Sequence, residues 1–169
     1  MMPRIDYLVR EKRSFRPIVL LLTVLVTSAC FCQSTSTDEA RQVSGTWVLK
    51  SIYPTQNVEG PGPPQQKKLL GSTIVLNMNS LKACGQSVPI TSVKTSQIEP
   101  SDFLMNTQAR FGEVGIEAPS ITEVVIINRE SGTCFGAFPL PGQDIYIKSK
   151  NEILVYFEGV IYRALRKKE

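Results

Sequence analysis

The chain has 169 residues and a formal net charge of +4, from 19 Lys and Arg against 15 Asp and Glu, and it contains no histidine. Five of the basic and two of the acidic residues lie in the first 30 positions, so the remainder of the chain is close to neutral. This remainder lacks the basic footprint of a nucleic-acid-binding protein. Without histidine, Ser-His-Asp and Cys-His catalytic arrangements are excluded.

An export signal is predicted over residues 1–29. Basic residues precede an apolar run at 18–26, and the small residues Thr27-Ser28-Ala29 follow it. This order of a charged, an apolar and a small-residue segment is that of a secretory signal peptide. The apolar run is shorter than the roughly 20 residues of a membrane-spanning helix. The alternative is a signal anchor that is not cleaved.

Cys30 directly follows these small residues, and "LVTSAC" resembles the bacterial lipobox, in which signal peptidase II cuts before a cysteine that is then lipidated. The lipobox prefers Leu or Val at the position that Thr27 occupies here. Lipidation of Cys30 leaves three cysteines in the mature chain, whereas free secretion leaves four. We therefore expect an exported protein, either a cell-envelope lipoprotein or a periplasmic or secreted protein, with a flexible tether over residues 30–44.

Cys84 and Cys134 are predicted to form a disulfide bond. Both lie in or beside strand-like runs of the folded region, and disulfide bonds persist in exported proteins. A bridge that closes a loop of about 50 residues contributes on the order of 4 kcal/mol in the chain-entropy model. The alternatives are two separate buried thiols or a zinc site, although Cys30-x-Cys32 lacks the spacing of a zinc ligand pair.

One folded domain is expected over residues 45–169. Residues 46–53 alternate between two faces, as a strand does. Residues 54–68 hold four prolines and two glycines, which predicts a long surface loop with one or two helical turns near its end. Further strands are predicted at 72–78, 82–88, 91–98, 121–128, 133–138, 143–148, 152–157 and 159–166.

One short helix interrupts these strands at residues 101–111. Ser101 suits the N-cap position and Gly112 the position just past the end of the helix. A helix here places Phe103, Thr107 and Phe111 along one face.

The fold class that follows is all-β and mainly antiparallel, an eight- to nine-stranded up-and-down barrel with one short helix. Closing the sheet into a barrel removes its exposed edges. A barrel of about eight strands has room for its own side chains or for one small ligand.

Gly45-Thr46-Trp47, at the head of the first strand, resembles the signature of the lipocalin and calycin superfamily. In that family the tryptophan closes one end of the barrel and a late arginine packs across its ring. The resemblance pairs Trp47 with Arg163, in a cation–π contact of about 0.5 to 2 kcal/mol. The chain differs from the family in its mid-chain helix and in ending on a strand. The alternative is that Trp47 is a core residue of another antiparallel sandwich.

The first functional hypothesis is a lipocalin-like protein that binds a small hydrophobic or amphipathic ligand in its barrel. The hydroxyl groups of Tyr146, Tyr156 and Tyr162 are candidate contacts for the polar end of such a ligand. The sequence contains no pattern that indicates an enzyme, a cofactor, a metal site or a nucleic-acid partner. Membrane contact is expected only through the signal or a lipid anchor.

The second hypothesis is a cell-envelope inhibitor that blocks a protease or lysozyme by protein contact, similar to small disulfide-bonded barrels with that activity. Its inhibiting element would be residues 31–44 or the loop at 54–68. A third hypothesis is a structural envelope lipoprotein without a pocket. An enclosed apolar cavity favours ligand binding, whereas a filled barrel with an ordered protruding loop favours inhibition.

Overall fold

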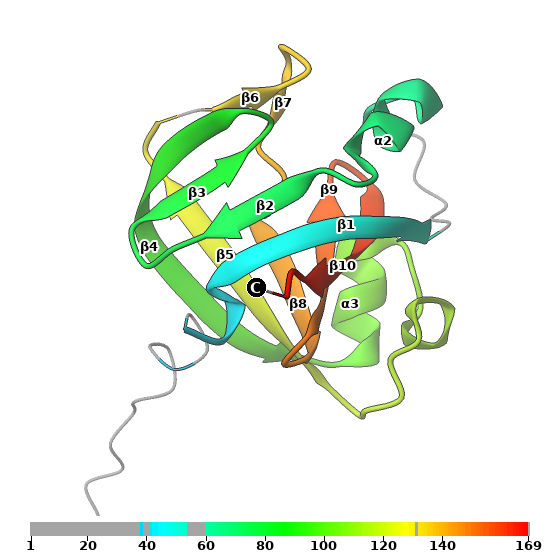
Figure 1. The fold of residues 1–169 in the computed structure, drawn as a ribbon. Helices are drawn as coiled ribbons and strands as arrows, with labels where there is room; N and C mark the ends of the chain where they lie inside the picture. The colour runs from blue at the N-terminus through cyan, green and yellow to red at the C-terminus, as the bar shows by residue number, and fades with distance from the viewer. Residues whose placement is uncertain (1–37, 39–40, 54–59, 131, 169) are drawn as a thin grey trace, which may run out of the picture. The chain divides into compact units, whose positions relative to one another are not determined.

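The computed structural model describes residues 38, 41–53, 60–130 and 132–168, all within the compact unit formed by residues 33–169 (Figure 1). The predicted export signal and Cys30 lie outside the described residues. No helix in the described part is long and apolar enough to cross a membrane.

Short strands dominate the described chain, as the sequence predicts. The helical turns expected near the end of the Pro-rich loop are present as α2, whereas residues 54–59 of that loop lie outside the described part. The elements in chain order are β1 (Gly45–Tyr53), α2 (Pro63–Leu69), β2 (Thr73–Leu76), β3 (Ser80–Ala83), β4 (Gln86–Ile98), α3 (Pro100–Thr107), the 3-10 helix η1 (Phe111–Val114), β5 (Ile121–Asn128), β6 (Thr133–Cys134), β7 (Phe138–Pro139), β8 (Asp144–Ser149), β9 (Glu152–Phe157) and β10 (Val160–Arg166).

Eight of these strands close into an antiparallel barrel in the order β1-β10-β9-β8-β5-β4-β3-β2 (Figure 1). Strands that follow each other in the chain pair with each other, except that the separate hairpin β6–β7 lies between β5 and β8. β1 pairs with β2 on one side and with β10 on the other, which completes the closure. The predicted up-and-down antiparallel barrel is confirmed.

The barrel interior is filled by side chains that alternate along the strands. On β8, for example, Ile145 belongs to the interior cluster, whereas the neighbouring Tyr146 packs outside the barrel. A void large enough to hold a water molecule would give the side chains around it some accessible surface. The interior side chains with 0% exposure are Trp47, Leu49, Ile74, Leu81, Val124, Ile145, Val155, Tyr162 and Ala164. Because these side chains have no accessible surface, none of them lines a space that could hold a ligand.

The two ends of the barrel are closed by different parts of the chain. We name them the Trp47 end, where β1 begins and β10 ends, and the hairpin end, where β6–β7 connects β5 to β8. Because neighbouring strands run antiparallel, the last residues of β1, β5 and β9 all lie at the hairpin end.

At the Trp47 end, Arg166 and Trp47 hold the chain as it enters the barrel. The Arg166 guanidinium lies 4.2 Å from the centroid of the Trp47 ring. Its Nη2 and Nη1 atoms donate to the carbonyls of Gln42 and Ser44, each at 2.6 Å. Trp47 Nε1 donates to the carbonyl between them, that of Val43, at 2.7 Å. Three successive carbonyls are thus bound, and the Val43 side chain, 3% exposed, joins the core.

The predicted pairing of Trp47 with Arg163 is wrong. Tyr162 lies in the same buried cluster as Trp47, so the alternation of β10 turns the next residue, Arg163, outward. There its Nη2 donates to Glu152 at 2.9 Å. Arg166, an even number of residues beyond Tyr162, pairs with Trp47 in register and supplies the cation.

The tether predicted for residues 30–44 also ends earlier than expected. Residues 41–43 form a helical turn, and the bonds of their carbonyls to Arg166 and Trp47 make this turn part of the barrel end.

α3 lies beside the barrel (Figure 1). A second buried cluster, outside the barrel, contains side chains of α3 and of the outer faces of the strands. Phe103 and Thr107 of α3 are 0% exposed. The Phe103 ring packs edge-on against the rings of Phe111 and Tyr146, with centroids 5.1 and 4.9 Å away. The predicted buried face of Phe103, Thr107 and Phe111 is confirmed.

The helix itself is shorter than the predicted 101–111. Its N-cap is Glu99 instead of Ser101, because Pro100 occupies the first helical position. Gln108 ends it with a left-handed φ of 59°, and Phe111 belongs to the separate helix η1.

We expect Arg166→Ala to lower the free energy of unfolding by about 2 to 4 kcal/mol, because it removes the cation–π contact and several charged hydrogen bonds. Arg163→Ala, on the same strand, should cost less than about 1 kcal/mol, since it removes a partly exposed ion pair. Urea denaturation followed by Trp47 fluorescence measures both. Equal losses for the two variants would contradict the assignment of Arg166.

Candidate functional site

The hairpin end of the barrel is closed by the buried residues Leu140, Pro141 and Gly142, which we call the plug. The Leu140 side chain is 1% exposed. Gly142, with a φ of 102°, lies so close to the inner wall that a Cβ atom there would come within 2.9 Å of Ile74 and 3.2 Å of Leu81. Glycine suits this position for both reasons. The chain returning from β6–β7 therefore runs through the end of the barrel.

The disulfide bond Cys84–Cys134 fastens the hairpin β6–β7 to the barrel, as the sequence predicts. Beside it, Gln86 of β4 binds the backbone of Thr133 twice: its Nε2 donates to the carbonyl at 2.9 Å, and its Oε1 accepts from the amide at 3.0 Å. Because the two cysteines are 50 residues apart, the bridge contributes on the order of 4 kcal/mol to stability. The plug follows directly after this fastened hairpin.

Asn128, the last residue of β5, has a buried side-chain amide whose nitrogen and oxygen both lack a hydrogen-bond partner among the residues that the structure describes. The alternation of β5 turns it inward, as it does Val124 and Ile126. It lies beside the chain leaving the plug, because the Ile126 amide donates to the carbonyl of Gln143 at 2.7 Å. An unpaired buried amide costs about 1 to 3 kcal/mol. The hairpin end thus contains a polar group that the closed structure leaves unsatisfied.

Replacement of Asn128 by leucine should raise the free energy of unfolding by about 1 kcal/mol, because an apolar side chain of similar shape carries no unsatisfied polar atoms. Urea denaturation measures the change. Asn79→Leu, at an exposed turn, is the control and should give no gain. A loss of stability in Asn128→Leu would show that the amide is satisfied in solution.

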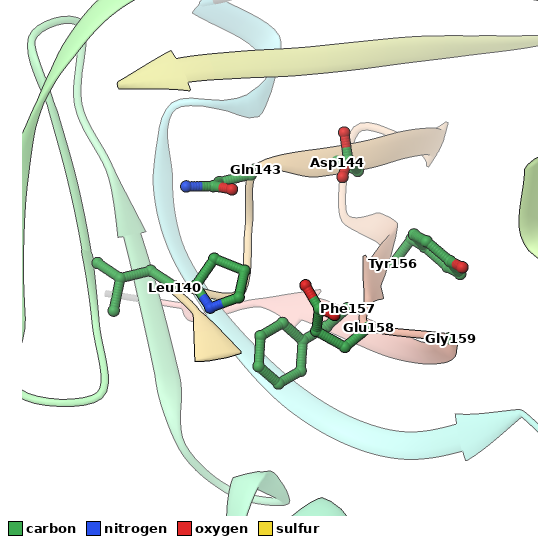
Figure 2. Close-up of a pocket in the computed structure, with 8 residues that line it drawn as sticks. Leu140, Gln143, Asp144, Tyr156, Phe157, Glu158 and Gly159 are labelled. Carbon is green, nitrogen blue, oxygen red and sulfur yellow. The ribbon is translucent and has the colours of Figure 1, made fainter. Parts of the chain in front are cut away.

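A surface pocket of about 210 Å³ lies at the rim of the hairpin end, beside the plug, and we call it the rim pocket. Figure 2 shows Gln143 and Asp144 on one side of it and Phe157 and Glu158 on the other. The plug, the start of β8 and the turn between β9 and β10 supply its lining: Pro139, Leu140, Gln143, Asp144, Tyr156, Phe157, Glu158 and Gly159.

The rim pocket carries negative charge, and none of the ion pairs between described residues neutralises it. Burial raises the pKa of the Asp144 carboxyl above its ordinary value, and the charges of Glu123 and Glu158 raise it further. The ion pairs among the described residues engage other carboxylates, those of Asp38 and Glu152. A cation bound in the rim pocket would therefore offset both the repulsion between these carboxylates and the partial burial of Asp144.

The three candidate tyrosines lie in two different environments. Tyr162 is inside the barrel core, where burial raises its pKa to about 12, and its hydroxyl is 3.5 Å from the carbonyl of Gln66. Tyr146 lies in the cluster under α3, and burial and the Glu123 charge raise its pKa. Tyr156 packs against that same cluster and also lines the rim pocket. The structure therefore brings Tyr146 and Tyr156 near each other outside the barrel and leaves Tyr162 apart from them in the interior.

The sequence does not single out Asp144, Glu158 or Asn128, although it contains a signal for two of them. Asp144 comes directly after the turn at Pro141-Gly142, at the head of a strand whose next residue points inward. Asn128 is a polar residue at an inward position of "ITEVVIIN". Within the described ranges, no group of three or more Cys, Asp and Glu side chains is arranged to hold a metal ion.

No protein-family model, curated protein or solved structure matches this chain. Its likeness to lipocalins therefore rests on the closed eight-stranded antiparallel barrel and on the arginine–tryptophan contact at one end. This likeness concerns the fold and implies no particular ligand or activity.

Asp144→Asn should stabilise the protein at pH 7. The folded-state pKa of Asp144 is raised, so its ionisation weakens the folded state progressively as pH rises through that pKa. Below pH 3.8, the ordinary value, the side chain is mostly protonated in both states and the advantage of the variant should vanish. Urea denaturation from pH 3 to pH 8 measures the difference. A gain that does not change with pH would contradict this account.

Proposed function

We propose that this chain is an exported, lipocalin-like binding protein that holds a small amphipathic cation in the rim pocket and catalyses no reaction. The observation that carries the proposal is the half-buried carboxyl of Asp144, which lines the pocket and whose pKa is raised by burial and by the charges of Glu123 and Glu158. A carboxylate in this position gains more from a bound cation than an exposed one does, because partial burial weakens its hydration.

The ligand site proposed here is the rim of the barrel instead of its interior. The interior is filled by its own side chains, and the plug and α2 cover the hairpin end. A ligand in the centre of the barrel, as the sequence led us to expect, would have to displace several fully buried side chains.

The lining of the rim pocket suits a ligand with one charged and one apolar part. Asp144 and Glu158 would receive an ammonium group, and the partly exposed rings of Pro139 and Tyr156 offer apolar contact. Ligand pockets for drug-sized molecules are about 300 to 1,000 Å³. At about 210 Å³, this pocket suits a molecule smaller than that.

Export of the protein is part of the proposal. The disulfide bond Cys84–Cys134 supports it, because such bonds persist in oxidising compartments outside the cytosol. The predicted signal at residues 1–29 and the candidate lipidation site Cys30 point the same way. The protein is then either a lipoprotein anchored through Cys30 or a freely secreted protein.

Three probes of equal length test the proposal: hexylammonium, hexanol and hexanoate. In an NMR titration at pH 7, hexylammonium should shift the backbone signals of residues 143–144 and 156–159 and bind at least about tenfold more tightly than the other two, because only it carries the matching charge. Asp144→Asn should abolish this preference, and Asp102→Asn, on the exposed side of α3, should leave it unchanged.

Equal binding of the three probes, or shifts that map elsewhere, would contradict the rim pocket as the site. Asp144→Asn is expected to be at least as stable as the parent protein, so a loss of binding in this variant does not arise from unfolding.

Inhibition of an envelope protease or lysozyme by protein contact is the second candidate function. The filled interior favours it, together with the hairpin β6–β7, which the disulfide bond fastens and whose tip at Gly136 and Ala137 is exposed. The elements that the sequence suggested are less suitable, because residues 41–44 are bound into the Trp47 end and α2 packs through Leu69. Residues 31–37 and 54–59 lie outside the described part. If this is the function, substitutions at the hairpin tip should abolish inhibition of the protease or lysozyme, and substitution of Asp144 should not.

A further inference from the structure

Three exposed lysines lie together at the Trp47 end of the barrel, at the opposite end from the rim pocket. Lys167 and Lys168 follow β10, and Lys150 lies in the turn between β8 and β9. The ion pairs of the described residues engage Arg41, Lys148 and Arg163 instead of these lysines. We call Lys150, Lys167 and Lys168 the basic face.

Arg166 fixes the three segments that make up this end. Besides its bonds to the entering chain, its Nε donates to the carbonyl of Lys150 at 2.9 Å. Its backbone amide donates to the carbonyl of Asn151 at 3.0 Å, and the amide of Lys167 donates to the carbonyl of Thr46 at 2.8 Å. The chain leaving β10 therefore continues along β1 as an ordered extension, and the lysines have defined positions.

Two surface grooves lie beside this extension. One, of about 530 Å³, is lined by Gly45, Thr46 and residues 166–168. The other, of about 200 Å³, is lined by Asn151 and residues 165–168. Lys167 and Lys168 border both grooves, so the basic face offers hollows as well as charge to an anionic group.

The chain also enters the domain at this end. The described structure at the Trp47 end begins with residues 41–43, and Cys30, the candidate lipid attachment site, is eleven positions before Arg41. Eleven residues span at most about 40 Å when fully extended. A domain tethered in this way stays near the bilayer surface, and its Trp47 end, where the tether enters, can contact that surface.

We propose that the basic face binds the anionic phospholipid surface of the membrane and orients the domain with its hairpin end away from the bilayer. This goes beyond ligand binding in the rim pocket and adds a membrane contact to the signal or lipid anchor. Lysines near an anionic surface attract it over a distance of about one Debye length, 8 to 10 Å at moderate ionic strength. Lys150, Lys167 and Lys168 lie at the end where the tether enters, and the tether lets this end come within the range of that attraction.

Sedimentation with vesicles tests this proposal on the mature chain carrying Cys30→Ser, which cannot be acylated. Vesicles of equal parts phosphatidylglycerol and phosphatidylcholine should bind it, and pure phosphatidylcholine vesicles should not. Replacing Lys150, Lys167 and Lys168 by alanine should weaken binding about 100-fold, since each basic residue contributes roughly a factor of five at such a surface.

The matched control replaces three exposed lysines elsewhere, Lys67, Lys68 and Lys82, by alanine and should leave vesicle binding within about twofold. Hydrogen exchange on the anionic vesicles should slow at residues 44–46, 150–151 and 166–168. Inorganic phosphate at millimolar concentration should not compete, because the face recognises a charged surface and not a single ion. Equal effects of the two triple variants, slowed exchange at β6–β7, or binding that does not depend on anionic lipid would overturn the proposal.

Discussion

The guanidinium of Arg166 is the group on which the closure of this barrel depends. It stacks on Trp47 from β1, binds the carbonyls of the entering chain, and reaches the turn between β8 and β9. An eight-stranded barrel exists only when its first and last strands pair. A guanidinium holds its donors in one rigid plane and can bind several carbonyls while its face lies on an indole, which a lysine cannot do.

Because the Trp47 end is closed in this way, access to the barrel interior depends on what closes the hairpin end. The hairpin end is covered by the plug, which the fastened hairpin β6–β7 holds in place. A barrel whose core is filled between two closed ends has no internal cavity in which a ligand could bind. The proposed ligand site therefore lies at the surface, and the half-buried carboxyl of Asp144 and the amide of Asn128, which has no hydrogen-bond partner in the described part of the chain, both lie near the hairpin end.

The sequence was sufficient to predict the barrel and its disulfide bond, but it was insufficient to predict the rim pocket. Alternating strands at regular spacing predicted the antiparallel closure, and two cysteines within strand-like runs predicted the bridge. The resemblance alone assigns Arg163 as the partner of Trp47, although the inward position of Tyr162 turns Arg163 outward. The rim pocket could not be predicted, because it joins the plug to a turn some 15 positions later, and because the raised pKa of Asp144 comes from partial burial that only tertiary structure determines.

The connection between β5 and β8 has a further consequence. These strands are adjacent and antiparallel, so a tight turn of two residues would suffice to join them. Residues 129–143 instead leave the sheet, carry half of the disulfide bond and return through the barrel as the plug. The closed sheet does not require this insertion, and a related barrel could lengthen, shorten or lose it without a change in strand order. The part that closes the hairpin end is thus also the part most open to evolutionary replacement.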